Sequence, residues 1–321
     1  MKRQLLGVAA ILLSISTYAQ DNPLWMRYCA ISPDGTTIAF TYKGDIYTVP
    51  STGGRASQIT TNPAHDTKPI WSPDGKKIAF ASDRMGSMDI FEVNKEGGIP
   101  KRLTTHSGNE TPVAYKDAGH ILFLANIMPT AEDAQFPSGQ FQQVYEVNTE
   151  GGRPVLFSSM PMEDISINHT GNTLLYHDKK GYEDPWRKHH TSSITRDIWL
   201  CSLNGNRTFR KQTAFNGEDR TPVWASDDKS FYYLSEEKGS FNIFRRDIDG
   251  NTSKQITNHT KHPVRFLSAA SNGTLCYGYD GEIYTVKEGA IPQKVQISIV
   301  TDKNDKDLIR HIKRTGATEI S

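Results

Sequence analysis

The residues best suited to catalysis or metal binding lie in one polar segment, residues 183–197, which reads EDPWRKHHTSSITRD. It places His189 and His190 close to Ser192 and Ser193, which could supply a serine–histidine pair or part of a metal site. Adjacent histidines in a loop need not converge, and the sequence identifies no third residue that would orient them. We therefore favour a polar recognition or docking loop over a catalytic one.

Motifs that carry catalysis or cofactor binding are missing from the sequence. It contains no G-x-S-x-G nucleophile elbow, no H-E-x-x-H, no P-loop and no G-x-G-x-x-G after a strand. Asp34 and Asp74 stand in two copies of an S-P-D-G turn and could suggest calcium. Aspartate at such positions more often accepts hydrogen bonds from its own backbone. The sequence therefore predicts no catalytic residue, no metal site and no cofactor.

The S-P-D-G turns belong to an internal repeat. ISPDGTTIAF at residues 31–40 matches WSPDGKKIAF at residues 71–80, and four weaker copies follow. The aromatic residue that ends each copy stands at positions 40, 80, 123, 176, 233 and 277. Blade-type repeats recur about every 40–50 residues, so this spacing indicates a repeat protein of that class.

A second element follows each copy of the turn. It is a polar, an aliphatic and an aromatic residue in a row, as in Asp45-Ile46-Tyr47, and it begins again at residues 89, 143, 197, 242 and 282. Glycine pairs then predict tight turns, and a short last strand often ends in threonine, as at Thr60 and Thr104. Each repeat therefore predicts four short strands.

Four antiparallel strands joined by short turns form one blade of a β-propeller, so six copies predict an all-β, six-bladed β-propeller. A β-sandwich would not need the repeated turn, and the coils of a β-solenoid usually repeat at shorter periods. Because the four strands of each repeat are continuous in sequence, we expect self-contained blades. In that case only apolar packing between the first and sixth blades would close the ring.

Two repeats carry inserts between their second and third strands, at residues 125–142 and 178–196. Equivalent connections open on the same face of a propeller, so both inserts should crowd one mouth of the central channel. Long loops on a rigid scaffold often carry recognition. The candidate channel-mouth residues, all in the second insert, are Trp186, Arg187, His189, His190 and Arg196.

The first 20 residues have the pattern of a secretory signal peptide. Lys2 and Arg3 precede an apolar run that is too short to span a membrane, and Thr17 and Ala19 suit the −3 and −1 positions of a cleavage site. We therefore expect a periplasmic or secreted protein with no membrane span. An uncleaved anchor is the alternative.

Charge and cysteine content argue against two further classes. The 321 residues include 37 Lys and Arg against 36 Asp and Glu, which leaves no basic excess for nucleic acid binding. The three cysteines, Cys29, Cys201 and Cys276, are too few for a disulfide framework. All three lie in strand-like runs, so we expect small buried hydrophobic residues.

The repeated S-P-D-G-x-x-I-A-F, followed by D-I-Y, resembles the propeller repeat shared by the periplasmic TolB protein and the tricorn peptidases. The segment WRKHHTSSITRDIWL, at residues 186–200, is similar to the fourth-blade region of bacterial tricorn-like serine peptidases. The order of signal peptide, NPLWMR at residues 22–27 and then S-P-D-G is similar to those proteins too. In that family a second propeller, a peptidase domain and PDZ-like domains follow, and the catalytic residues lie there. The resemblance therefore implies none in this chain.

The resemblance implies a division of the chain and a role. We expect a signal peptide at residues 1–20, a propeller at residues 21–299, and a linker with the start of a following domain at residues 300–321. The implied role is a non-catalytic substrate-access propeller of a secreted tricorn-like serine peptidase. Its channel would pass peptides or unfolded polypeptide to peptidase domains of the same parent chain. Whether the propeller forms homo-oligomers stays open.

Two other functions stay open. A TolB-like protein-binding scaffold of the cell envelope is one, although that family carries an extra domain before its propeller and only residues 21–30 are available for it here. A propeller enzyme, such as a glycosidase or lactonase, is the other. Its site would need carboxylates or metal ligands that converge on the channel, which one sequence cannot show.

Overall fold

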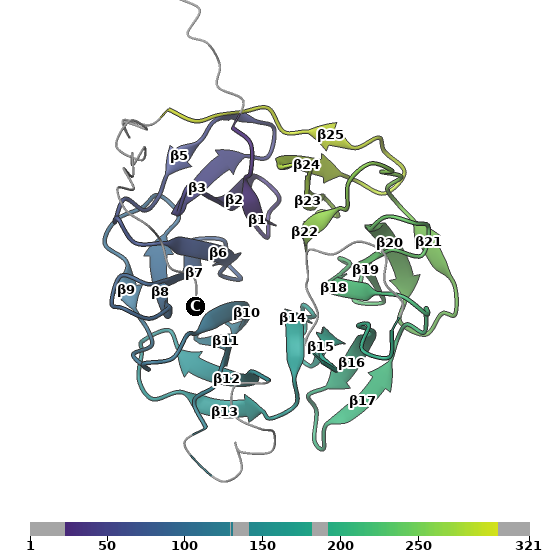
Figure 1. The fold of residues 1–321 in the computed structure, drawn as a ribbon, viewed down its shortest axis with the longest axis horizontal. Coiled ribbons are helices and arrows are strands. Elements are labelled where there is room, and N and C mark those ends of the chain that lie inside the picture. The colour runs from purple at the N-terminus through teal and green to yellow at the C-terminus, as the bar shows by residue number, and fades with distance from the viewer. Residues whose placement is uncertain (1–22, 129, 131–140, 182–191, 301–321) are drawn as a thin grey trace, which may run out of the picture.

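The computed structural model describes residues 23–128, 130, 141–181 and 192–300. The regular elements in this part of the chain are strands, and they form six four-stranded antiparallel sheets around a central axis (Figure 1). The first strand of each sheet lies nearest the axis and the last lies at the rim. The predicted all-β, six-bladed propeller with four antiparallel strands per blade is confirmed.

The first three blades run in chain order from the axis to the rim. Blade 1 contains β1 (Arg27–Ile31), β2 (Thr37–Tyr42), β3 (Asp45–Pro50) and β5 (Ser57–Gln58). Blade 2 contains β6 (Asp66–Trp71), β7 (Lys77–Ser82), β8 (Asp89–Asn94) and β9 (Lys101–Arg102). Blade 3 contains β10 (Thr111–Asp117), β11 (His120–Ala125), β12 (Gln143–Asn148) and β13 (Val155–Ser158).

The last three blades repeat the same order. Blade 4 contains β14 (Met162–Ile167), β15 (Thr173–Asp178), β16 (Ile198–Ser202) and β17 (Thr208–Lys211). Blade 5 contains β18 (Asp219–Trp224), β19 (Ser230–Ser235), β20 (Asn242–Asp247) and β21 (Ser253–Gln255). Blade 6 contains β22 (Arg265–Ala269), β23 (Leu275–Tyr279), β24 (Glu282–Val286) and β25 (Gln293–Lys294).

The second strand of each blade is apolar on both faces because a neighbouring blade covers each face. In β2, Ile38, Ala39 and Phe40 are all fully buried. Ile38 and Phe40 pack into the cluster shared with blade 6, whereas Ala39 packs into the cluster that contains Ile78 and Phe80 of blade 2. The repeated I-A-F therefore sets two large side chains on one face and a small one on the other.

The S-P-D-G turn joins the first and second strands and is held by its own aspartate. Asp34 Oδ1 accepts a hydrogen bond from the Thr36 N–H at 3.0 Å, and Asp74 Oδ1 accepts one from the Lys76 N–H at 3.1 Å. Gly35 has a φ of 77°, a left-handed conformation that glycine adopts without steric cost. The expectation that these aspartates bind their own backbone is confirmed.

The threonine that ends four of the repeats has a common role. Its hydroxyl oxygen accepts a hydrogen bond from the backbone N–H of the aliphatic residue near the start of the third strand, at 2.9–3.0 Å. This side-chain bond extends the pairing of the outermost strand beyond its last backbone bond. The pairs are Thr60 with Ile46, Thr104 with Ile90, Thr213 with Ile198 and Thr257 with Ile243.

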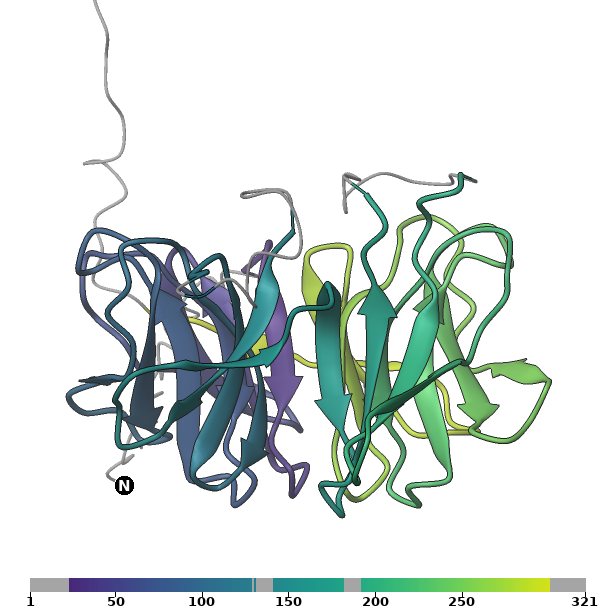
Figure 2. The same ribbon diagram turned by 90° about the horizontal axis from the view of Figure 1, so that it is seen from below.

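The two connections that carry inserts leave the disc on the same face. Ala125 ends β11 and Asp178 ends β15, and the described residues beyond both strands rise from one face in the side view of Figure 2. Residues 129, 131–140 and 182–191 are outside the described residues. Four of the predicted channel-mouth residues therefore have no described position: Trp186, Arg187, His189 and His190.

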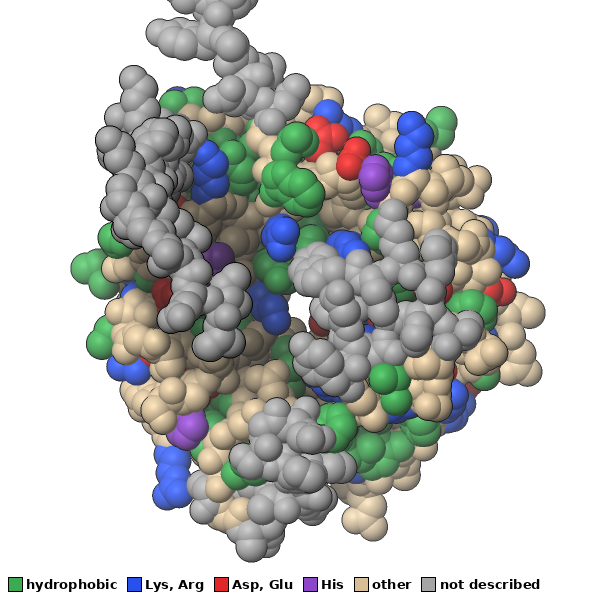
Figure 3. All heavy atoms as spheres, in the orientation of Figure 1, with side chains coloured by type: hydrophobic (Ala, Val, Ile, Leu, Met, Phe, Trp, Pro, Cys, Tyr) green, Lys and Arg blue, Asp and Glu red, His purple; other side chains and the backbone are tan. Residues whose placement is uncertain are grey.

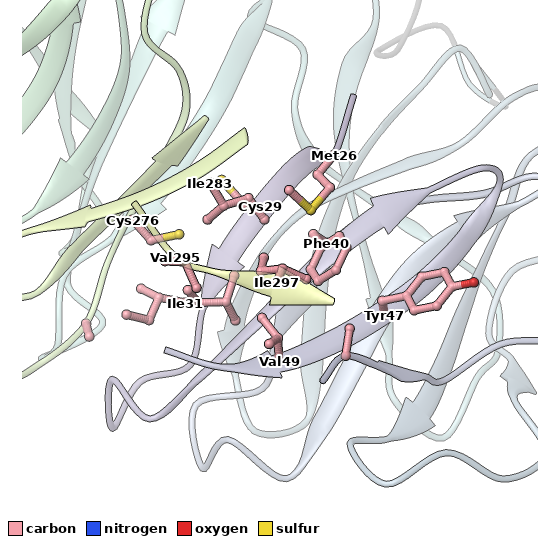
Figure 4. Packing of buried hydrophobic residues seen from close by; sticks show 13 residues of the cluster. Met26, Cys29, Ile31, Phe40, Tyr47, Val49, Cys276, Ile283, Val295 and Ile297 are labelled. Carbon is pink, nitrogen blue, oxygen red and sulfur yellow. The ribbon is translucent and has the colours of Figure 1, made fainter. Parts of the chain in front are cut away.

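The seam between blades 1 and 6 shows how the ring closes (Figure 4). Each blade is self-contained, as predicted, because every four-stranded sheet takes its strands from one repeat. The expectation that only apolar packing closes the ring is wrong. Beyond β25, the short strand β26 (Ile297–Ser298) pairs in parallel with β4 (Gly54–Arg55) on the rim of blade 1.

Backbone hydrogen bonds therefore add to the packing at this seam, which we call the latch. The Gly54 N–H donates to the Gln296 carbonyl at 2.8 Å, and the Ala56 N–H donates to the Ser298 carbonyl at 2.9 Å. A Cβ at Gly53 would stand 2.6 Å from the Gln296 oxygen, so only glycine permits this approach. The latch can form because backbone N–H groups on the rim of blade 1 find carbonyl partners in the segment that follows β25.

The three cysteines are buried and free, which confirms the expectation of small buried residues. Cys29 lies in β1 and Cys276 in β23, and both belong to the apolar cluster at the seam between blades 1 and 6. Cys201 lies in β16 and belongs to the cluster between blades 3 and 4. Their position in the strands follows from the apolar pattern of the repeat.

Candidate functional site

The innermost strands of the six blades enclose a cavity on the axis. Its volume is about 560 Å³, and its lining comes from β1, β6, β10, β14, β18 and β22 with a few residues from other elements. Figure 3 shows the hollow at the centre of one face of the disc. A cavity of this size and depth can hold a short stretch of extended peptide or a small molecule.

The innermost strands are not regular, and their irregularity faces the cavity. Each one has a register shift against its second strand, which is the mark of a β-bulge. In five blades a residue other than glycine at this bulge has a φ between 48° and 58°. Such left-handed residues are uncommon and gather at functional sites. All five line the cavity: Tyr28, Lys68, Asp164, Thr221 and Phe266.

The cavity lining carries an excess of positive charge, although the whole chain is close to neutral. Five basic side chains and two carboxylates belong to the lining. A concave surface with one dominant sign of charge concentrates ligands of the opposite sign. The basic residues are Lys68, Lys179, Arg196, Arg220 and Arg265, and the carboxylates are Glu163 and Asp164.

Arg196 and Arg220 are held by one buried carboxylate at the interface of blades 4 and 5. Arg196 Nη1 lies 2.9 Å from Glu218 Oε1, and Arg220 Nη1 lies 3.5 Å from the same oxygen. The Arg220 guanidinium also lies 4.0 Å from the ring centre of Phe241. Burial lowers the pKa of Arg220 to about 10, which still leaves it charged at neutral pH. Arg196 Nε also lies 3.5 Å from Glu163 Oε2, so the two arginines contact two carboxylates, of which only Glu163 belongs to the cavity lining.

A second set of polar contacts surrounds Glu163 on β14. Its Oε1 accepts from Lys179 Nζ at 2.7 Å, and its Oε2 lies 3.2 Å from His177 Nε2. Burial alone would raise the pKa of the Glu163 carboxyl, but the contacts with His177 and Lys179 outweigh burial and hold that pKa well below its usual range. The Thr221 N–H donates to His177 Nδ1 at 3.2 Å, which assigns the proton of the neutral ring to Nε2.

This geometry positions charge but does not assemble a nucleophile and a base. Both ring nitrogens of His177 are engaged, one by Glu163 and one by the Thr221 backbone, and the ring is buried. A catalytic base needs a free ring nitrogen within reach of a nucleophile. The described lining of the cavity is therefore suited to binding an anionic group.

The structure places one predicted site residue at the cavity. Arg196 lines it from the end of the second insert, where it is buried and paired with Glu218. Sequence reasoning missed Glu163, His177 and Arg220. A signal was available: charged residues gather where the innermost strands of blades 4 and 5 begin, at residues 163–164 and 218–220.

Two features are absent from the described residues. Within residues 23–128, 130, 141–181 and 192–300, no three histidine, cysteine, aspartate or glutamate side chains gather in a way that could hold a metal ion. The same part of the chain has no helix long and apolar enough to cross a membrane.

Comparison with known proteins connects this chain to a family. The family model described as the Tricorn protease N-terminal beta propeller domain matches residues 23–290. Tricorn protease homolog 1 of Streptomyces coelicolor is 25% identical over 281 residues, which cover 86% of this chain and 25% of that protein. A tricorn protease homolog of Saccharolobus solfataricus is 27% identical over 295 residues, which cover 88% of this chain and 26% of that protein.

A solved structure shows the same fold. The crystal structure of the tricorn protease matches with a TM-score of 0.73 at 20% identity, over 88% of this chain and 27% of that one. The chain thus spans about a quarter of the length of these relatives. The family match covers most of the chain and coincides with the described propeller. The chain therefore belongs to the family of tricorn protease N-terminal beta propeller domains.

Proposed function

We propose that this propeller is a non-catalytic substrate-access module of a secreted tricorn-like serine peptidase, whose channel admits peptides on their way to a peptidase domain. The observation that carries the proposal is the cavity on the axis, with five basic side chains against two carboxylates. Every peptide ends in a carboxylate, so a positively charged channel attracts peptide termini and acidic segments. Family membership supports the link to a peptidase.

The contacts at the cavity suit selection by charge. Arg196 and Arg220 keep donors directed at one shared carboxylate, and Lys68 projects from the opposite part of the ring on a left-handed residue of β6. Lysine and arginine bind carboxylates by charge-assisted hydrogen bonds, which are stronger than neutral ones. Both insert-bearing connections leave on one face, where a peptide would first meet the propeller.

Peptide binding tests this proposal directly. The probe is a fluorescein-labelled octapeptide with a free C-terminal carboxylate, compared with the same peptide carrying a C-terminal amide, by fluorescence anisotropy at low salt. We expect the carboxylate peptide to bind more tightly. Lys68→Gln removes one half-buried cavity cation and should weaken its binding about 3- to 10-fold, the effect of losing roughly 1 kcal/mol.

A matched variant separates the cavity from the surface. Lys76 lies on an exposed turn outside the cavity, so Lys76→Gln should change the affinity less than about twofold. Equal binding of both peptides, with no effect of Lys68→Gln, would rule out recognition by the cavity charge. Binding of folded envelope proteins in place of peptides would instead favour the TolB-like scaffold.

A further inference from the structure

Two of the three cysteines meet across the seam that closes the ring. Cys29 in β1 and Cys276 in β23 lie in one apolar cluster between blades 1 and 6, and Figure 4 shows both among the side chains that fill it. Burial raises the pKa of the Cys276 thiol, and the neighbouring Cys29 thiol raises it further. The two residues therefore share one apolar cluster across the seam, although almost the whole ring separates them in sequence.

The backbone around the pair is fixed by a single serine. Ser268 Oγ accepts from the Ile31 N–H at 3.0 Å, and it lies 3.5 Å from the Cys29 carbonyl and 3.4 Å from the Cys276 carbonyl. The Cys29 thiol donates to the Phe266 carbonyl at 3.5 Å. These contacts fix the position of β1 relative to blade 6. A fixed register is what a cross-link between two strands requires, because disulfide geometry tolerates little displacement.

The two cysteines differ in access. Cys29 lines the central cavity and is 4% exposed, whereas Cys276 is fully buried behind it. Of the two, only Cys29 borders the cavity, so we expect exchange with a reagent to begin at Cys29. Cys201, the third cysteine, lies in the cluster between blades 3 and 4, where no other cysteine is among the described members. The structure thus singles out one pair.

We propose that Cys29 and Cys276 form a disulfide that covalently joins blade 1 to blade 6 when the protein meets a disulfide oxidant. The Cys29 thiolate attacks one sulfur of the oxidant, which releases the other sulfur as a thiol and leaves a mixed disulfide. Cys276 then loses its proton, its sulfur bonds to the Cys29 sulfur, and the bond from Cys29 to the remaining oxidant sulfur breaks, which releases that sulfur as a second thiol. The two cysteines are oxidised, and the oxidant disulfide is reduced to two thiols.

The cross-link would act on the same seam as the latch. With both thiols reduced, the latch, the Ser268 contacts and apolar packing hold blade 1 to blade 6. With the disulfide formed, the ring stays closed even when those contacts open. Disulfides persist in oxidising compartments. The export that the sequence predicts would bring the chain into a compartment where the cross-link can persist.

Thiol counting with mass spectrometry tests the proposal on the full chain. The reduced protein is oxidised with oxidised glutathione in two ways, in the folded state and during refolding from denaturant. It is then alkylated under denaturing conditions and digested. Of the three cysteines we expect only Cys201 to be alkylated, and we expect one peptide pair linked through Cys29 and Cys276.

Variants give matched controls. Cys201→Ala should keep the cross-link, and its melting temperature should rise on oxidation and fall again with dithiothreitol. Cys276→Ala should lose both the cross-link and the redox-dependent shift. If all three thiols of the wild-type chain are alkylated after both treatments, or if Cys201 joins the cross-link, the proposal is wrong. The peptide mapping uses the wild-type chain, so this result does not depend on the folding of any variant.

Discussion

The interface between blades 4 and 5 and the seam between blades 1 and 6 share one backbone feature, the left-handed residue at the β-bulge of each innermost strand. The side chains at this position differ between the two. At both, two left-handed residues of neighbouring innermost strands meet beside the cavity. Between blades 4 and 5, the Thr221 hydroxyl donates to Asp164 at 2.7 Å. Between blades 1 and 6, the rings of Tyr28 and Phe266 lie 4.8 Å apart. The fold sets the position of the bulge, and the side chain there determines whether the cavity wall is polar or apolar at that point.

This difference gives the ring two kinds of joint. The interface of blades 4 and 5 has a buried ion pair between Arg196 and Glu218 in addition to an apolar cluster, whereas the seam of blades 1 and 6 has apolar packing and, at the rim, the latch. Ion pairs leave polar groups facing the cavity, where a ligand can use them. Apolar packing leaves little for a ligand but gives the seam its cohesion. The following predictions probe this contrast.

The largest effect should come from the apolar seam. Phe40 is fully buried between blades 1 and 6, so Phe40→Ala should lower the free energy of unfolding by about 3–5 kcal/mol, because it removes a large side chain and leaves a cavity. Urea unfolding measures this loss. Phe209→Ala, at an exposed residue on the rim, is the control and should cost under about 1 kcal/mol. Similar costs for both variants would contradict the cohesive role of the seam.

The ion-paired interface should respond to loss of its shared anion. Glu218→Gln leaves Arg196 and Arg220 buried without their common carboxylate and should cost about 3 kcal/mol of unfolding free energy. Asp249→Asn, which breaks an exposed pair with Arg210, should cost under about 1 kcal/mol. Chemical unfolding of both variants checks this. A Glu218→Gln variant as stable as the wild type would show that packing alone holds this interface.

Stability should depend on pH at the same interface. Burial raises the pKa of Asp219 to about 7, with the nearby Asp197 also raising it, against an ordinary value of 3.8. Between these two values the folded state binds a proton that the unfolded state has lost, so stability falls as pH rises from about 4 to about 7. Asp219→Asn should remove this part of the slope and stabilise the protein by about 1–3 kcal/mol above pH 7.

Thermal unfolding of the wild type and of Asp219→Asn between pH 4 and pH 8 measures the effect. Glu110, whose pKa burial raises to about 7, acts in the same direction between blades 2 and 3, so a smaller slope should remain in the variant. Parallel pH profiles for the two proteins would show that Asp219 does not titrate in this range.

The smallest effect should be similar in both regions. Thr60 of blade 1 and Thr257 of blade 5 make the same hydrogen bond to the start of the third strand, at 2.9 and 3.0 Å. Thr60→Val and Thr257→Val should each cost about 1 kcal/mol in urea unfolding, because each leaves one backbone donor unpaired. The Thr257 hydroxyl also donates to Asn242 Oδ1 at 2.9 Å, so the cost of Thr257→Val should be the higher, by less than about 1 kcal/mol. Unequal costs, by more than about 1 kcal/mol, would mean that the contrast between the regions extends to the rim.

The fold could be predicted because its information is local. Each turn, each triplet and each closing threonine lies within one repeat, and the periods of 40 residues and more identify a blade. The charged cavity wall could not be predicted in the same way. Glu163 and Arg220 stand in different repeats, and only the ring brings their strands together. Of the predicted site residues, Arg196 has a described position at the wall.

The latch was missed for a related reason. β26 has two residues and pairs with two others near the opposite end of the propeller, so it has no periodic pattern to reveal it. Nothing in the composition of residues 297–298 distinguishes a strand from a tail. The close approach of Gln296 to Gly53 becomes visible only when the ring is closed.

The position of the latch has a consequence for the order of folding. The contacts inside a blade join residues that are close in sequence and can form as soon as the repeat is made. The contact between Ile31 and Ser268 joins residues 237 positions apart, and the latch spans a similar distance. During synthesis the apolar face of blade 1 stays uncovered until blade 6 arrives, which exposes it to association with other chains. We therefore expect ring closure to be the slowest step of folding, so that its rate sets how long that surface is exposed.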